Sequence, residues 1–394
     1  MLEFVLLAAR SFDGRQIRGP VAIRVGDGRI LKVGTDVGHI GADVAAIDLG
    51  PDSCLMPGLV DAHVHLAFNA SSDPISALTA MDDQQLLTTM ERTALTAVRA
   101  GITTVRDLGD RGYLAAVLRG KTMDRPENAP EIVYAGVPIT TLNGHCSFLG
   151  GAVASSDELP AAVRERRSRG CPVVKLMVSG GNMTPASPPP YRPQFTRHEI
   201  SIVVAEAHRL GMLVAAHVHG TEAIRDAVAA GVDTIEHVSF MTEDGNNIDP
   251  GLVREIVDRG VFVSLTLGFH PAAGVPDLPP AVAARVESIH DAYRLMYEAG
   301  AKLVLGTDAG IAAFKPHDVL PYAVEELAKI GVAAPDALAA ATSVAADACG
   351  LGHRKGRIVE GADADFVVVT GDPMADLTVL RQPEAVFRAG VRVH

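Results

Sequence analysis

The sequence predicts an α/β protein built on a (β/α)8 barrel, the TIM-barrel architecture, with a small β-sandwich domain contributed by both ends of the chain. Three observations lead to this prediction. Short apolar runs alternate with amphipathic stretches through the middle of the chain, eight such runs occur, and both ends instead show short alternating strands. A doubly wound sheet would also alternate strands and helices, but eight units and the polar residues that end the runs favour a barrel.

The two ends of the chain resemble each other in pattern. Residues 1–55 contain the runs EFVLLAAR, PVAIRVGDGRILKVG and AAIDLG, and Gly26-Asp27-Gly28 between two alternating runs indicates a hairpin. Residues 357–394 contain GRIVEGADADFVVVTGDP and AVFRAGVRVH. We therefore expect residues 1–55 and 357–394 to form the β-sandwich, and residues 56–356 to form the barrel.

The middle of the chain carries the barrel signal. Stretches such as TRHEISIVVAEAHRLG are amphipathic, and Thr196 followed by Glu199 is a capping-box pattern. Several helices are expected to end at a glycine, which tolerates the left-handed position there. The eight apolar runs that predict the barrel strands are GLVDAHVH, GITTVRDL, PEIVYAGV, PVVKLMVS, MLVAAHVH, GVDTIEHV, GVFVSLT and AKLVLGTD.

Composition excludes several classes of protein. With 35 basic and 47 acidic residues in 394, the net charge is −12, which argues against a nucleic-acid partner. No stretch of about 20 apolar residues could cross a bilayer, and Glu3 and the missing basic start argue against an export signal. The four cysteines are scattered with no CxxC pair, so we expect a cytoplasmic protein without a thiolate metal site. Charge and length permit a monomer or a homo-oligomer.

Potential metal ligands end several of the predicted strands, where a barrel places its active site. His63 and His65 lie on one side of their strand because side chains alternate. Lys175 in VVKLM must be buried, paired or modified, since apolar residues flank it on both sides. Each signal is weak alone, but together they indicate a site for zinc or a similar divalent ion rather than structural histidines. The strand-end residues are His63, His65, Lys175, His217, His219, Glu236, His237 and Asp308.

Over nearly its full length the chain resembles the amidohydrolase superfamily. The matching motifs are PGLVDAHVHL, GITTVRDLG, VVKLMVSGG, AAHVHG, AGVDTIEHVSF and LGTDAG, with the tail GRIVEGADADFVVVTGDPMADL. The strand-four lysine followed by SGG and Met-Thr-Pro resembles the zinc-dependent Xaa-Pro dipeptidase and carboxypeptidase branch, which also includes ochratoxin-hydrolysing amidases. Gly220 stands where deaminase branches of the superfamily carry Glu, which disfavours ring deamination.

The resemblance implies a binuclear centre of two divalent ions, with zinc as the default. His63, His65 and Asp308 would hold the first ion, His217 and His237 the second, and carbamylated Lys175 would bridge the two. A hydroxide shared by both ions would attack the amide, and Asp308 would shuttle its proton to the leaving amine. Either His217 or His219 can ligate from strand five; the resemblance favours His217.

The expected substrate is a small-molecule amide, either a dipeptide or an N-acyl amino acid. His145, Tyr191 and His219 are candidates for contacting it, and His270, beyond strand seven, is a further candidate. Arg106 is instead expected to pair with an acid inside the barrel. The alternatives are a hydrolase of a cyclic amide, a lactone or a xenobiotic amide with the same centre, and a metal-binding scaffold without catalysis. No GxSxG or GxxxxGK[ST] motif supports a serine hydrolase or a nucleotide hydrolase.

Overall fold

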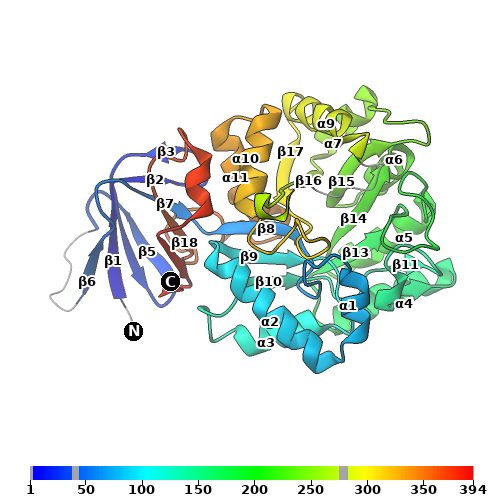
Figure 1. Cartoon of the computed structure of the whole chain (residues 1–394), viewed down its shortest axis with the longest axis horizontal. Coiled ribbons are helices and arrows are strands. Elements are labelled where there is room, and N and C mark those ends of the chain that lie inside the picture. The colour runs from blue at the N-terminus through cyan, green and yellow to red at the C-terminus, as the bar shows by residue number, and fades with distance from the viewer. Residues whose placement is uncertain (1–2, 38–43, 275–282, 394) are drawn as a thin grey trace.

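The computed structural model describes residues 3–37, 44–274 and 283–393, so the remaining positions of the predicted domains lie outside the described residues. A smaller body of β-strands lies beside a larger α/β body, and both chain ends lie in the smaller one (Figure 1). The larger body holds the residues that the sequence singles out for chemistry.

All eight predicted core strands are present, and each pairs in parallel with its neighbours. They form two sheets, in the orders β10-β9-β8 and β13-β14-β15-β16-β17. Most of their residues are buried on both faces, as parallel strands covered by helices should be. The strands are β8 (Leu59–Val64), β9 (Ile102–Asp107), β10 (Glu131–Tyr134), β13 (Val173–Met177), β14 (Leu213–Gly220), β15 (Thr234–Met241), β16 (Phe262–Thr266) and β17 (Lys302–Gly306).

The two parallel sheets meet at both edges through single bridges rather than full ladders. Val64 bridges to Ala309 at one edge, and Ile139 bridges to Leu176 at the other. The sequence led us to expect one continuous eight-stranded ring. Among the described residues the strand pairing does not form such a ring. The architecture is a TIM-barrel-like α/β fold, and the carboxyl ends of its strands converge on one side.

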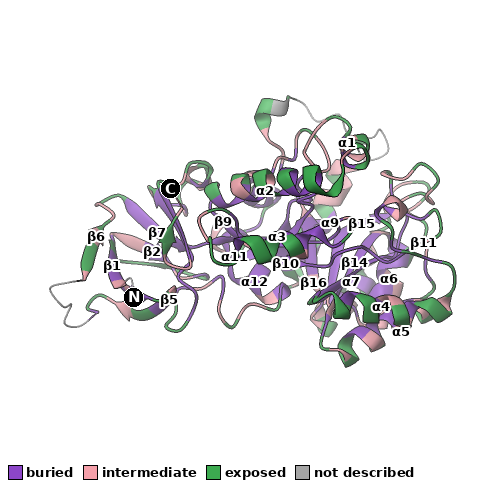
Figure 2. Ribbon diagram, turned by 90° about the horizontal axis from the view of Figure 1, so that it is seen from below, coloured by how far each residue is buried: buried purple, intermediate pink, exposed green. Residues whose placement is uncertain are grey.

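Helices cover these strands, and many residues on the outer sides of the helices are exposed (Figure 2). The predicted capping box is confirmed, because the Glu199 N–H donates to Thr196 Oγ1 and the Thr196 N–H donates to the Glu199 carboxylate. No helix among the described residues is long and apolar enough to cross a membrane. The α-helices are α1 (Pro74–Ala80), α2 (Asp83–Arg99), α3 (Leu114–Thr122), α4 (Leu159–Ser168), α5 (Arg197–Arg209), α6 (Thr221–Ala230), α7 (Pro250–Arg259), α9 (Val286–Glu298), α10 (Leu320–Ile330), α11 (Ala334–Ala340) and α12 (Ser343–Ala348).

The chain ends form two further sheets, in the orders β5-β4-β1-β6 and β20-β19-β18-β7-β2-β3. Both contribute to one apolar cluster that includes Phe4, Ile23, Leu55 and Phe366. The predicted hairpin is confirmed by antiparallel pairing of β4 with β5. The β-sandwich description and the domain boundaries stay predictions. These strands are β1 (Glu3–Ala8), β2 (Arg10–Phe12), β3 (Ile17–Arg18), β4 (Val21–Gly26), β5 (Arg29–Gly34), β6 (Ala45–Asp48), β7 (Ser53–Pro57), β18 (Phe366–Thr370), β19 (Ala385–Arg388) and β20 (Val391–Arg392).

Candidate metal centre and active site

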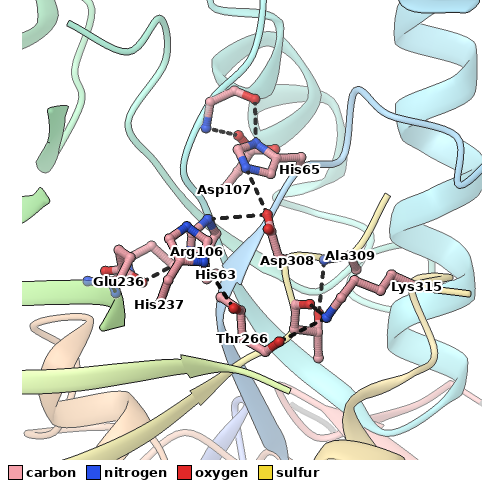
Figure 3. A network of polar contacts seen from close by, with 12 residues as sticks. His63, His65, Arg106, Asp107, Glu236, His237, Thr266, Asp308, Ala309 and Lys315 are labelled. Atoms are coloured by element: carbon pink, nitrogen blue, oxygen red, sulfur yellow. Dashed lines mark hydrogen bonds and ion pairs between the residues drawn. The ribbon is translucent and has the colours of Figure 1, made fainter. Parts of the chain in front are cut away.

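A first group of potential metal ligands lies where β8 and β17 end. Oδ1 of Asp308 is 3.4 Å from Nε2 of His63 and 3.2 Å from Nε2 of His65 (Figure 3). The Asp308 N–H donates to the His63 carbonyl at 2.7 Å, so the pairing of the two strand ends brings these side chains together. Gly306 permits this approach, because a Cβ there would lie 2.4 Å from Cβ of His63. The three residues predicted for the first ion are thus neighbours.

A second group consists of His217 and His219 in β14 and His237 in β15. One ring nitrogen from each lies within 4.8 Å of those of the other two. Measured between ring centroids, His237 is 4.6 Å from His217 and 4.5 Å from His219. Both β14 histidines are therefore equally close to His237, and His217 as the ligand stays a prediction.

Lys175 of β13 lies in the same cavity as both histidine groups. Its side chain is buried, and its Nζ has no hydrogen-bond partner among the residues that the structure describes. Burial lowers the pKa of Lys175 to about 8. An ammonium is costly to bury, so burial increases the fraction of the neutral amine, the form that can take an added group. Two clusters of imidazole and carboxylate donors beside such an amine fit a pair of divalent ions.

Neighbouring groups orient the imidazoles. Nδ1 of His65 is 3.0 Å from the Gly109 carbonyl, and Nδ1 of His237 is 3.0 Å from Thr266 Oγ1. Nδ1 of His63 is 2.9 Å from a carboxylate oxygen of Glu236. Each contact engages Nδ1 and leaves Nε2 available, the usual arrangement around a ligating histidine.

Glu236 and Arg106 form a buried ion pair behind His63. Nη2 of Arg106 donates to Oε1 of Glu236 at 3.0 Å, and neither side chain is accessible to solvent. The expectation that Arg106 pairs with an acid inside the barrel is confirmed. Although burial alone would raise it, the charge of Arg106 and the hydrogen bond from His63 hold the pKa of Glu236 well below its ordinary value.

The protonation states of most candidate ligands suit metal binding. His65 is the exception: burial would lower the pKa of its imidazole, but the hydrogen bond and the charge of Asp308 outweigh burial and raise it. Burial lowers the pKa of His63 to about 4, and burial with neighbouring imidazoles lowers the pKa of His217 and His237 well below the ordinary value. These rings are therefore neutral at physiological pH, the form that binds metals. Burial would raise the pKa of Asp308, but His63 and His65 hold it well below its ordinary value, so Asp308 is ionised.

Two of the candidate ligands have left-handed backbone conformations. The φ angle is +71° at His237 and +58° at Asp308. Residues other than glycine seldom adopt this conformation, at a cost of about 1–3 kcal/mol each, and such residues cluster at functional sites. The surrounding structure must therefore stabilise these two strand ends.

A cavity of about 500 Å³ opens above both groups. It contains all the predicted metal ligands, together with His145 and His219. The centroid of the His145 ring is 4.6 Å from that of His217, and within the described part of the chain its Nδ1 has no partner, which suits a substrate contact. Gly181 makes room for it, since a Cβ there would lie 2.4 Å from the imidazole. Apolar lining residues include Ile75, Met177, Met183, Phe269, Ile289 and Phe314.

Two other candidates lie outside the lining of this cavity. Tyr191 lines a neighbouring hollow of about 490 Å³, which shares Gly181 and Asn182 with the main cavity. Tyr191 belongs to the loop after β13, which folds back on itself at the isolated bridge between Ser179 and Pro193. His270 packs its ring 5.0 Å from that of Tyr322.

Three residues that hydrogen-bond to the strand ends of the site are not among those predicted from the sequence: Asp61, Thr266 and Lys315. Asp61 accepts hydrogen bonds from the N–H and hydroxyl of Thr307, and Lys315 donates to the Thr307 carbonyl. Asp61 lies two residues before His63 on the same side of β8, which was a usable signal. Nothing in the sequence distinguishes Lys315, which follows β17 in an irregular loop.

Comparison with known proteins identifies the family of the chain. Residues 54–393 match the model of the amidohydrolase family. The ochratoxinase of Aspergillus niger is 29% identical over 368 residues, which cover 84% of this chain and 73% of that protein. A crystal structure of a Xaa-Pro dipeptidase with bound methionine has a TM-score of 0.86 and 28% identity, and covers 99% of both chains. The structure of a molinate hydrolase shares the fold, with a TM-score of 0.85 and 20% identity. The match covers 99% of this chain and 94% of that one. The chain belongs to the amidohydrolase family and is a hydrolytic enzyme.

Proposed function

We propose that this enzyme is a metal-dependent amidohydrolase that cleaves the amide bond of a dipeptide or an N-acyl amino acid. The observation that carries the proposal is the convergence of two three-residue ligand groups and an unpartnered buried lysine in one cavity. A relative named as an ochratoxinase and a structural neighbour named as a Xaa-Pro dipeptidase support the substrate class.

His63, His65 and Asp308 would hold one divalent ion, and His217 and His237 the other. Zinc is the expected ion, since imidazole and carboxylate suit it. Bound there, the ions would polarise the amide carbonyl and lower the pKa of water. The residues of the chain position the substrate, hold the imidazoles in one tautomer and move the proton.

Lys175 would bridge the ions as a carbamate. Its neutral amine adds to carbon dioxide, which forms one N–C bond and releases one proton. The lowered pKa of about 8 leaves more of the amine neutral at physiological pH than an exposed lysine has, and no hydrogen bond from the described residues competes for Nζ. A carbamate supplies two anionic oxygens where a protonated lysine would repel dications.

Asp308 is the proposed proton carrier. Its carboxylate lies at the floor of the cavity, ionised and held by two histidines. It takes a proton from the attacking water and returns it to the leaving nitrogen, the work of a general acid–base. His145, whose ring lies beside that of His217, is the proposed contact to the carbonyl or carboxylate of the substrate.

A second candidate substrate class is an uncharged amide, including a cyclic or xenobiotic one. One observation favours it: among the described lining residues, Lys315 is the only lysine or arginine besides Lys175, and its ammonium donates to backbone carbonyls. A substrate carboxylate would then depend on imidazoles or on the ions. The apolar walls suit an uncharged group equally well.

The test is an assay for released amine with zinc-loaded protein and a library of dipeptides, N-acyl amino acids and uncharged amides. We expect release from amides with an apolar side chain. Asp308→Asn is the matched variant and should lose about 100- to 10,000-fold in turnover while its circular dichroism is unchanged. Turnover equal to wild type in this variant would remove Asp308 from the mechanism. Release confined to uncharged amides would favour the second class.

A further inference from the structure

Lys315 makes contacts that the proposed mechanism does not use. It follows β17 and is buried, with 6% of its surface exposed. Its Nζ lies 2.6 Å from the Thr307 carbonyl, 3.0 Å from the Thr266 carbonyl and 3.4 Å from the Leu267 carbonyl. An ammonium has three donors and no acceptor, so three carbonyls match its hydrogen-bonding capacity.

These carbonyls belong to the ends of two strands that support the two ligand groups (Figure 3). Thr307 directly precedes Asp308, and Thr266 bears the hydroxyl that contacts Nδ1 of His237. β16 and β17 are adjacent, and their last paired residues are Thr266 and Gly306. Lys315 donates hydrogen bonds to both strands at or just after this last pair. Lys315 thus holds the residue that precedes Asp308 in the chain and the residue whose hydroxyl contacts His237, so it touches the surroundings of one ligand of each proposed ion.

Thr307 is held from its other side by Asp61. The Thr307 N–H donates to Asp61 Oδ1 at 2.9 Å, and its hydroxyl donates to Oδ2 at 2.6 Å. With Lys315 on its carbonyl, every polar group of Thr307 is engaged. The next residue, Asp308, has a φ of +58°. A residue fixed on both sides can keep its neighbour in this unfavourable conformation.

We propose that Lys315 is a positioning residue of the metal centre. Acting with Asp61 on Thr307, it keeps Asp308 in its left-handed conformation, and through Thr266 it orients His237. It contributes no ligand atom. This inference rests on the proposed metal site, and it predicts that the removal of one ammonium outside both ligand groups weakens metal binding.

The experiment compares Lys315→Met with wild type by titrating metal-free protein with Co²⁺ and recording the visible spectrum of the bound ion. Lys302→Met is the matched control. Lys302 also donates to a backbone carbonyl, that of Gly260 at 3.2 Å. Unlike Lys315, it is exposed and lies at the start of β17. Loss of a group that supports metal ligands typically weakens affinity by about 10- to 100-fold.

We expect Lys315→Met to weaken Co²⁺ binding by about 10-fold or more and to change the spectrum, with Lys302→Met equal to wild type. Lys315→Arg, which keeps a cation and has room because position 315 lines the cavity, should recover part of the affinity. At saturating metal, kcat should fall with little change in KM. If Lys315→Met does not fold, Lys315→Gln, which keeps two donors, replaces it.

Wild-type affinity and an unchanged spectrum in the Lys315 variant would overturn the positioning role. Equal losses in the Lys315 and Lys302 variants would also overturn it. If wild type itself binds no divalent ion, the proposed metal site fails, and this result is distinct from the other two.

Discussion

Replacing Glu236 by glutamine tests how the ion pair behind His63 supports the centre. Glu236 accepts from Arg106 at 3.0 Å, from Thr234 at 2.8 Å and from His63 at 2.9 Å, and its side chain is inaccessible. Glutamine keeps the shape but removes the charge, which leaves the Arg106 guanidinium buried without a counter-charge. Breaking a buried pair in this way costs about 3–5 kcal/mol of unfolding free energy.

This cost can be converted to a melting temperature. Unfolding entropy is about 2.1 cal/mol/K per residue, so the 394 residues correspond to roughly 0.8 kcal/mol/K if the chain unfolds as a unit. Glu236→Gln should therefore lower the Tm of metal-free protein by about 4–6 °C. Its amide N–H would also face Nδ1 of His63 and move the imidazole proton to Nε2, the nitrogen nearest Asp308. Metal affinity should fall as well.

Calorimetry on metal-free protein measures the effect. Glu255→Gln is the control, because Glu255 makes a similar 2.8 Å pair with Arg259, but on the surface, where such pairs contribute little. The double variant Arg106→Met/Glu236→Leu should lose less stability than Glu236→Gln, because it leaves no buried charge unpaired. A Glu236→Gln protein that melts within about 1 °C of wild type would refute this reasoning.

Three further predictions concern the bridge, the strand-five ligand and acid stability. Lys175→Ala should bind the metal pair more weakly in equilibrium dialysis; native affinity for two ions would rule out the carbamate bridge. His217→Ala should lower metal content and His219→Ala should leave it unchanged, and the reverse result would assign His219 as the ligand. Burial alone would raise the pKa of Glu131, but Arg354 and Lys355 beside it hold this pKa at about 2, below its ordinary 4.5. Glu131 therefore stabilises the fold above pH 4.5, and this is lost as pH falls toward 2. In acid melts Glu131→Gln should lose less stability over that interval than wild type, and an equal loss would contradict the assignment.

The eight core strands could be predicted because their burial on both faces leaves continuous apolar runs in the sequence. The candidate ligands could be predicted because the carboxyl ends of parallel barrel strands all lie on one side of the barrel, where the active site forms. His63 and Asp308 are far apart in sequence, yet each ends its apolar run. Local pattern was sufficient for these features.

Features that depend on pairing between distant segments could not be predicted. Glu236 reaches His63 because of how two non-adjacent strands are placed, and Lys315 reaches Thr307 because of the path of an irregular loop. Residues 185–193, in the loop after β13, are rich in proline and have no periodicity, so their sequence did not indicate that Tyr191 lines the neighbouring hollow. Nor does a count of strands reveal that the two sheets meet at single bridges.

The most direct test of the proposed centre is the number of divalent ions bound per chain, measured by elemental analysis of wild-type protein after zinc loading and removal of free metal. The two ligand groups and Lys175 predict two ions per chain. A folded protein that retains none, or only one with Lys175→Ala retaining the same number, would contradict a binuclear centre bridged by Lys175.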